Sequence, residues 1–143
     1  MCKRLITILA AYIGLSGSVF SSTGMVIAIL ADELFVGEAE GHLSGAGTLA
    51  IHSQKDPGLT CLGQFTSSAE LGGVGQLNCS DGTSATFHFQ RLTVFRGYGA
   101  GSSSRGAMSF AYGLTAEEAA PYLKLPKGKK LRHNEAQLEL VDL

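Results

Sequence analysis

Between residues 34 and 113, apolar and polar side chains alternate with a period of two, and short glycine-rich segments interrupt the alternation. Because successive side chains of a β-strand point to opposite faces of a sheet, this pattern predicts strands. Each is joined to the next by a short turn, so we expect an all-β antiparallel meander of about six to eight strands that forms a small barrel or sandwich. The predicted strands span 34–41, 42–53, 59–68, 73–79, 83–95, 96–102 and 106–113.

Glycines spaced two apart suggest how such a sheet is packed. The pattern G-x-G-x-L occurs at 45–49 and at 73–77, and GYGAG follows at 97–101. Glycines two apart share one face of a strand, so an aromatic ring of a neighbouring strand can lie directly over the backbone. The candidate rings are Phe65, Phe87, Phe89, Phe110 and Tyr112.

The same glycines allow a second interpretation, in which the bare face forms a slot for a flat apolar ligand. That ligand face would consist of Gly97, Gly99, Gly101, Phe87 and Phe89. The protein would then be a barrel that binds a small apolar or aromatic molecule.

The segment NCSDG at 78–82 places a cysteine beside a tight turn. Outside the N-terminal segment, Cys61 and Cys79 are the two cysteines of the chain, and in an exported protein they predict one disulfide. That bond would close a loop of about 18 residues and stabilise the fold by roughly 3 kcal/mol. Asp81-Gly82 favours a two-residue hairpin turn, so we interpret Asp81 as a turn residue. His88 lies too far along the next strand to serve Ser80 as a base, and we expect no catalysis here.

The N-terminal segment, residues 1–31, has the character of a targeting sequence. Two basic residues precede an apolar run at 5–15, and small residues at 16–18 fit a cleavage site. The whole stretch 5–31 lacks charge, and at about 1.5 Å per residue it is long enough to span a bilayer. We therefore expect either a cleaved signal peptide or an uncleaved anchor, followed by one exported domain at 32–143. That domain would be periplasmic or secreted, or held at the inner membrane and facing the periplasm.

After Gly113 the alternation stops. Thr115 and Glu118 have the spacing of a capping box and predict a short helix, which Pro121 would interrupt. The last segment, 136–143, is predicted as a closing strand.

Between the predicted helix and the last strand, basic residues are concentrated at 124–132. They either complement the end of the helix or form a patch for an anionic partner, such as a membrane surface or an acidic envelope polymer. The patch consists of Lys124, Lys127, Lys129, Lys130 and Arg132.

Other function classes find little support in the sequence. The net charge of −1 provides no overall field that would attract nucleic acid. None of the four histidines has a partner at metal-ligand spacing, and the glycine-rich segment 97–106 lacks the Lys-Ser/Thr of a phosphate-binding loop. We expect no metal, no cofactor and no enzyme activity.

The segment LNCSDGTSATFHF, at 77–89, resembles the C-x-D-G strand-turn-strand of small periplasmic lysozyme inhibitors of the membrane-bound C-type class. The resemblance implies an exported single-domain β-barrel that inhibits a hydrolase such as lysozyme. The loop with which that family plugs a lysozyme active site has no counterpart of the same order, although 99–113 is similarly rich in serine and glycine. Our main expectation from the sequence is an exported cell-envelope protein with a non-catalytic binding or structural role.

Overall fold

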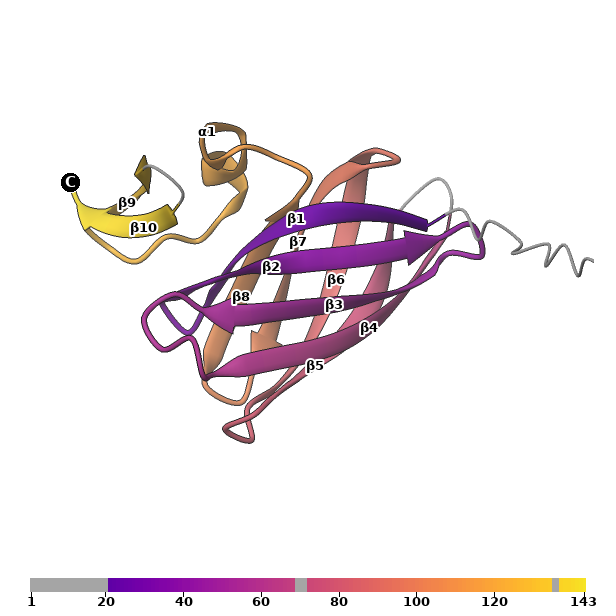
Figure 1. Cartoon of the computed structure of the whole chain (residues 1–143), viewed down its shortest axis with the longest axis horizontal. Helices are drawn as coiled ribbons and strands as arrows, with labels where there is room; N and C mark the ends of the chain where they lie inside the picture. Colours follow the sequence, from indigo (N-terminus) through magenta and orange to yellow (C-terminus); the bar gives the residue numbers. More distant parts are fainter. Residues whose placement is uncertain (1–20, 69–71, 135–136) are drawn as a thin grey trace, which may run out of the picture.

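A computed structural model describes residues 21–68, 72–134 and 137–143 of the chain. Eight antiparallel strands form a closed barrel in which each strand pairs with its sequence neighbour, and β1 pairs with β8 (Figure 1). The strands are β1 (Ser21–Leu30), β2 (Glu33–His42), β3 (Ala46–Ser53), β4 (Thr60–Ser68), β5 (Gly72–Cys79), β6 (Ser84–Thr93), β7 (Arg96–Ser103) and β8 (Gly106–Tyr112). The predicted all-β meander barrel is thus confirmed.

β1 was not expected as a strand, because it lies inside the segment 1–31 that the sequence predicted as a signal or anchor. It pairs with β2 along its whole length and with β8 from Val26 to Leu30. Alternate residues of β1 point into the barrel, and Ile27 and Ile29 between them are covered from outside. Because both faces of residues 26–30 are buried, this half of the strand is apolar and shows no alternation. The predicted domain boundary after residue 31 is therefore wrong.

The folded domain includes Ser21 to Leu30. The prediction of a signal peptide or anchor now concerns residues 1–20, which lie outside the described residues, and it stays a prediction.

Aromatic rings lie over glycines throughout the barrel interior, as the glycine spacing predicted. A β-carbon added at Gly99 would lie 2.4 Å from Cζ of Phe110, and one at Gly75 would lie 2.4 Å from Cζ of Phe87. The rings also contact one another edge to face, with centroids 5.1 Å apart for Phe87 and Phe110. An eight-stranded barrel is just wide enough for side chains to fill its interior, and glycines allow these large rings to fit.

The C-terminal part covers the outside of the barrel near the end of β1, and β9 and β10 lie beyond that end in Figure 1. It consists of α1 (Ala116–Ala119), the 3-10 helix η1 (Ala120–Tyr122), β9 (Lys129–Asn134) and β10 (Gln137–Asp142). Leu114, Leu123 and Leu138 pack in one cluster with Ile27 and Ile29 of β1. The capping box is present, since Thr115 Oγ1 accepts from the backbone N–H of Glu118 and the Glu118 side chain accepts from the backbone N–H of Thr115.

The last segment does not close the barrel, contrary to the sequence prediction. β10 pairs with β9 in a separate two-stranded sheet. β1 and β8 pair with each other and close the barrel, so no open edge remains to which a further strand could pair. Among the described residues, no helix is long and apolar enough to cross a membrane.

The barrel has two distinct ends. The β1–β2, β3–β4, β5–β6 and β7–β8 turns lie at one of them, which we call the disulfide end because Cys61 and Cys79 lie there. The start of β1 and the β2–β3 and β6–β7 turns lie at the opposite end, which we call the N-terminal end. Two predicted strands ran too far at this end, since 42–53 included Leu43 and 83–95 included Val94 and Phe95, all of which lie in turns.

Candidate functional site

The predicted ligand face lies inside the barrel. Phe87 and Phe89 of β6 point inward, and Gly97, Gly99 and Gly101 of β7 face the same interior. A β-carbon at each of these glycines would lie 2.4 Å or less from the side chain or backbone of a neighbouring residue. The space that a flat ligand would need is therefore occupied by the rings of the protein itself, and a ligand there would have to displace them.

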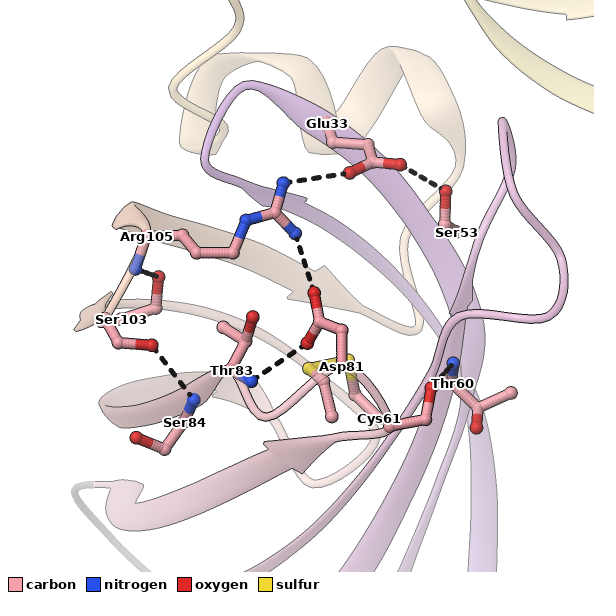
Figure 2. Close-up of a disulfide and its surroundings, with 12 residues drawn as sticks. Glu33, Ser53, Thr60, Cys61, Asp81, Thr83, Ser84, Ser103 and Arg105 are labelled. Carbon is pink, nitrogen blue, oxygen red and sulfur yellow. Dashed lines mark hydrogen bonds and ion pairs between the residues drawn. A yellow bond between two sulfur atoms is a disulfide. The ribbon is translucent and has the colours of Figure 1, made fainter.

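At the disulfide end, Cys61 and Cys79 face each other on β4 and β5 and form the predicted disulfide. Beside it, Arg105 bridges two carboxylates, as Figure 2 shows. Its Nη2 lies 3.6 Å from Oε2 of Glu33, and its Nη1 lies 3.3 Å from Oδ2 of Asp81. Ser53 Oγ donates a hydrogen bond to Glu33. These contacts connect the β1–β2, β3–β4, β5–β6 and β7–β8 turns across the end of the barrel.

The residues beside Cys79 have structural roles. Asp81 Oδ1 accepts a hydrogen bond from the backbone N–H of Thr83 at 2.9 Å, so Asp81 is a turn residue as predicted, but the connection between β5 and β6 covers residues 80–83 and is not the predicted two-residue turn. Hydrogen bonds from the side chain and backbone of Thr83, and more weakly the charge of Arg105, hold the pKa of Asp81 below its usual value. Ser80 Oγ accepts from the backbone N–H of Thr60 at 3.1 Å. His88 points outward from β6, away from the interior that Phe87 and Phe89 fill.

The basic residues of 124–132 are distributed along the C-terminal cover. Lys129 forms an ion pair with Asp142 and Arg132 with Glu139, in both cases across the β9–β10 hairpin. Lys124, Lys127 and Lys130 are exposed, and none of them has an ion-pair partner among the described residues. The patch of five cations is thus reduced to three unpaired lysines.

The outward face of β3 to β7 is a surface that the sequence did not single out, and we call it the uncharged wall. Apart from Arg96 at the first position of β7, which turns away to Glu118, the outward side chains carry no carboxylate, ammonium or guanidinium group. A protein surface usually carries about 25–35% charged residues, so a surface of this size would ordinarily include about five charged side chains. Its residues are Thr48, Ala50, His52, Thr60, Leu62, Gln64, Thr66, Val74, Gln76, Asn78, Ser84, Thr86, His88, Gln90, Tyr98, Ala100 and Ser102.

Two shallow grooves open on this wall, and one of them extends beyond it to the carboxylates of Glu38 and Glu40 on β2. Thr48, Gln64 and Gln76 line both of them. Strand register places these three side chains in one row across the sheet, and the row continues through Thr86 and Ser102. Neighbouring members of the row are about 4.8 Å apart, which is the spacing of strands in a sheet. The wall therefore presents a continuous line of hydroxyl and amide groups across five strands.

The polar side chains of the wall form few hydrogen bonds with one another. Among the described residues, the hydrogen bond from Tyr98 Oη to Gln90 Oε1, at 2.8 Å, is the only one between two side chains of the wall. The amides of Gln64, Gln76 and Asn78 are left to solvent, where each offers two donors and an acceptor without charge. Such a surface can bind by hydrogen bonding, but it offers no nucleophile with a base and no concentrated charge.

A signal for the wall was present in the sequence. Between residues 41 and 90 there are four charged residues, Lys55, Asp56, Glu70 and Asp81; Lys55, Asp56 and Asp81 lie between strands, and Glu70 is outside the described residues. The polar positions of the alternation are instead threonine, glutamine, asparagine, serine and histidine. Within the described part of the chain, no three histidine, cysteine, aspartate or glutamate residues come together as a metal site.

No protein-family model matches the chain, and no curated protein or solved structure is significantly similar to it.

Proposed function

We propose that this protein is an exported, non-catalytic binding protein of the cell envelope that holds a neutral glycan against the uncharged wall. The observation that supports this proposal is the absence of charge from the outward face of five adjacent strands, together with the groove without charged residues that opens there between Thr48 and Ser102. Depletion of charged residues distinguishes the centre of a binding surface from ordinary protein surface.

The chemistry of the wall favours a neutral ligand rich in hydroxyl groups. A charged ligand would lose hydration at the wall without gaining an opposite charge, and an apolar one would cover Gln64 and Gln76 without giving them partners. A neutral glycan supplies both donors and acceptors along its length. At one side of the wall, Tyr98 stacks on Tyr122 with ring centroids 4.2 Å apart, which adds an aromatic surface of the kind that sugar rings contact.

The assignment to the envelope depends on two further features. The Cys61–Cys79 disulfide is compatible with a non-cytoplasmic compartment, where such bonds persist. The N-terminal sequence is predicted to direct export. The alternative functions predict other behaviour: an interior ligand would remain bound in native mass spectrometry, and a hydrolase inhibitor would slow lysozyme at stoichiometric excess.

The test is binding of soluble oligosaccharides, measured by titration calorimetry and by NMR shift mapping. We expect neutral β-linked or α-linked glucan or chitin oligomers to bind, with little dependence on salt, and to shift the amide signals of Gln64 and Gln76. Gln64→Glu with Gln76→Glu should abolish binding, because each change places a charge in the row without changing its shape. Gln137→Glu is the matched control, since Gln137 is an exposed strand glutamine on β10, outside the wall.

Two results would contradict the proposal. The first is that no neutral oligomer binds. The second is binding of acidic glycans alone, weakened by salt and by changing Lys124, Lys127 and Lys130 to glutamine. That second result would transfer the function to the basic patch of the C-terminal cover.

A further inference from the structure

The two described turns at the N-terminal end of the barrel carry exposed apolar side chains. In the β2–β3 turn, Leu43 is 84% exposed. At the β6–β7 turn, Leu92, Val94 and Phe95 are 48%, 64% and 63% exposed. Large apolar side chains gathered at one end of a domain mark an interaction site, whereas single ones scattered over a surface do not.

The opposite end has a different character. Its turns carry Asp32, Lys55, Asp56, Asp81 and Arg105, whereas positions 43–45 and 94–95 at the N-terminal end have no charged residue. The described turns thus differ in polarity along the barrel axis, being charged at the disulfide end and apolar at the N-terminal end, where residues 69–71 are not described. Such asymmetry is expected of a domain that has water at one end and an apolar phase at the other.

The two apolar turns stand on opposite sides of the barrel. Along the closed sheet, the β2–β3 turn and the β6–β7 turn are separated by four strands out of eight. Figure 1 shows both at the end where β1 begins. A flat apolar layer that lies across this end of the barrel could therefore receive both tips at once.

The start of β1 indicates which apolar layer this is. Ser21 pairs with His42, the residue before Leu43, so the chain enters the barrel beside one of the apolar tips. The sequence before Ser21 contains the apolar run 5–15, which is preceded by basic residues in the manner of a segment that meets a bilayer.

We propose that the N-terminal end of the barrel rests on a phospholipid bilayer, with the side chains of Leu43, Val94 and Phe95 inserted at the level of the head groups. The barrel axis is then perpendicular to the membrane plane. This contact is independent of the proposed glycan binding, because none of the three side chains belongs to the uncharged wall. It also differs from the predicted membrane contact through 124–132, since the β9–β10 hairpin contacts Gln54 in the β3–β4 turn, at the disulfide end.

A tryptophan reporter tests the proposal directly, because the natural chain contains none. Phe95→Trp places the only tryptophan at an apolar tip, and Val74→Trp places it on the wall, where the native side chain is 61% exposed against 63% for Phe95. Both variants are made in the full chain and incorporated into vesicles of phosphatidylcholine and phosphatidylglycerol, with and without brominated acyl chains. Any anchoring by residues 1–20 is therefore the same in both.

We expect the emission of Phe95→Trp to shift to shorter wavelength on addition of vesicles, and brominated lipid to quench it several times more strongly than that of Val74→Trp. Equal quenching of the two variants would overturn the proposal. So would a blue shift of Phe95→Trp that grows with protein concentration without vesicles, since the tip would then pack on a second copy of the chain. Leu43→Trp provides a second reporter at the other tip if circular dichroism shows that Phe95→Trp does not fold.

Discussion

One methyl group added at Gly99 should destabilise the barrel, whereas the same group at Gly24 should not. Both glycines lie in strands, Gly99 in β7 and Gly24 in β1. A β-carbon at Gly99 would lie 2.3 Å from the carbonyl oxygen of His88 and 2.4 Å from Cζ of Phe110. At Gly24 the nearest atom would be the backbone nitrogen of Gly113, at 3.8 Å, which is an ordinary van der Waals contact.

The magnitude follows from two opposing effects. To accept the methyl group at Gly99, β6 and the Phe110 ring must each withdraw by about 1 Å, and such overpacking of a core costs about 1–3 kcal/mol. Replacing glycine by alanine also restricts the unfolded chain, which returns about 0.4–1 kcal/mol. Gly99→Ala should therefore lower the free energy of unfolding by about 1.5 kcal/mol. Gly24→Ala has the second effect alone and should raise it by about 0.5 kcal/mol.

The assay is equilibrium unfolding in guanidinium chloride, followed by far-ultraviolet circular dichroism with the disulfide intact. A difference of about 2 kcal/mol between the two variants appears as a lower denaturant midpoint for Gly99→Ala with an unchanged slope. In a thermal scan it corresponds to roughly 6–12 °C for a domain of this size.

A double-mutant cycle locates the effect. Phe110→Leu shortens the side chain that meets the new methyl group, so Gly99→Ala should cost less in the Phe110→Leu background than alone. Two results would contradict this reasoning: equal stability of Gly99→Ala and Gly24→Ala, or additive effects of the changes at Gly99 and Phe110. Either result would show that the Phe110 ring is not in close contact with Gly99.

Three further predictions concern the turns and the helix cap. Replacing both bridged cysteines by alanine should lower the free energy of unfolding by about 3 kcal/mol in chemical denaturation, as expected for the closed loop. Ala31→Gly should raise it by about 0.5–1 kcal/mol, because Ala31 occupies the β1–β2 turn at a φ of 49°, where glycine is not strained; an unchanged midpoint would contradict this. The pKa of Glu118 is lowered by hydrogen bonds from the backbone and side chain of Thr115, and by Arg96, so its contribution to stability is present above its usual pKa of 4.5 and is lost as the pH falls through the lower folded value. Thr115→Ala should raise that pKa in an NMR titration, and no change would show that the capping box does not hold the carboxylate.

The sequence predicted β2 to β8 because each of them has one face in the barrel interior and one face in water or under a thin cover. β1 could not be recognised in this way. Its outward residues Ile27 and Ile29 are covered by Leu123 and Leu138, which come about a hundred residues later in the chain. Burial of residues 26–30 on both faces removes the alternation there, and an apolar segment that follows an apolar leader has the composition of a longer leader.

The two candidate binding surfaces were missed for different physical reasons. The residues of the wall were correctly placed on outward faces, but their shared lack of charge becomes apparent only when strand pairing sets Gln64 beside Gln76 and Thr48. The apolar tips were misread as strand because Leu43, Val94 and Phe95 continue the apolar pattern into turns, where polar residues are usual. In both cases the informative property depends on which segments lie next to one another in the fold. The sequence of a single strand does not contain that information.

If the barrel stands on its N-terminal end, the orientation of the glycan row on the membrane can be derived. Strands of a small barrel are tilted by about 35–45° to its axis, so a row that crosses them perpendicularly is tilted by a similar angle from the membrane plane. A glycan bound along the row from Thr48 to Ser102 would then leave the surface obliquely, and the wall would remain open while the tips are in lipid. We therefore expect vesicle-bound protein to bind oligosaccharide with the same affinity as protein in solution. Competition between vesicles and oligosaccharide would show that the wall and the lipid contact overlap, and that the barrel lies on its side rather than on its end.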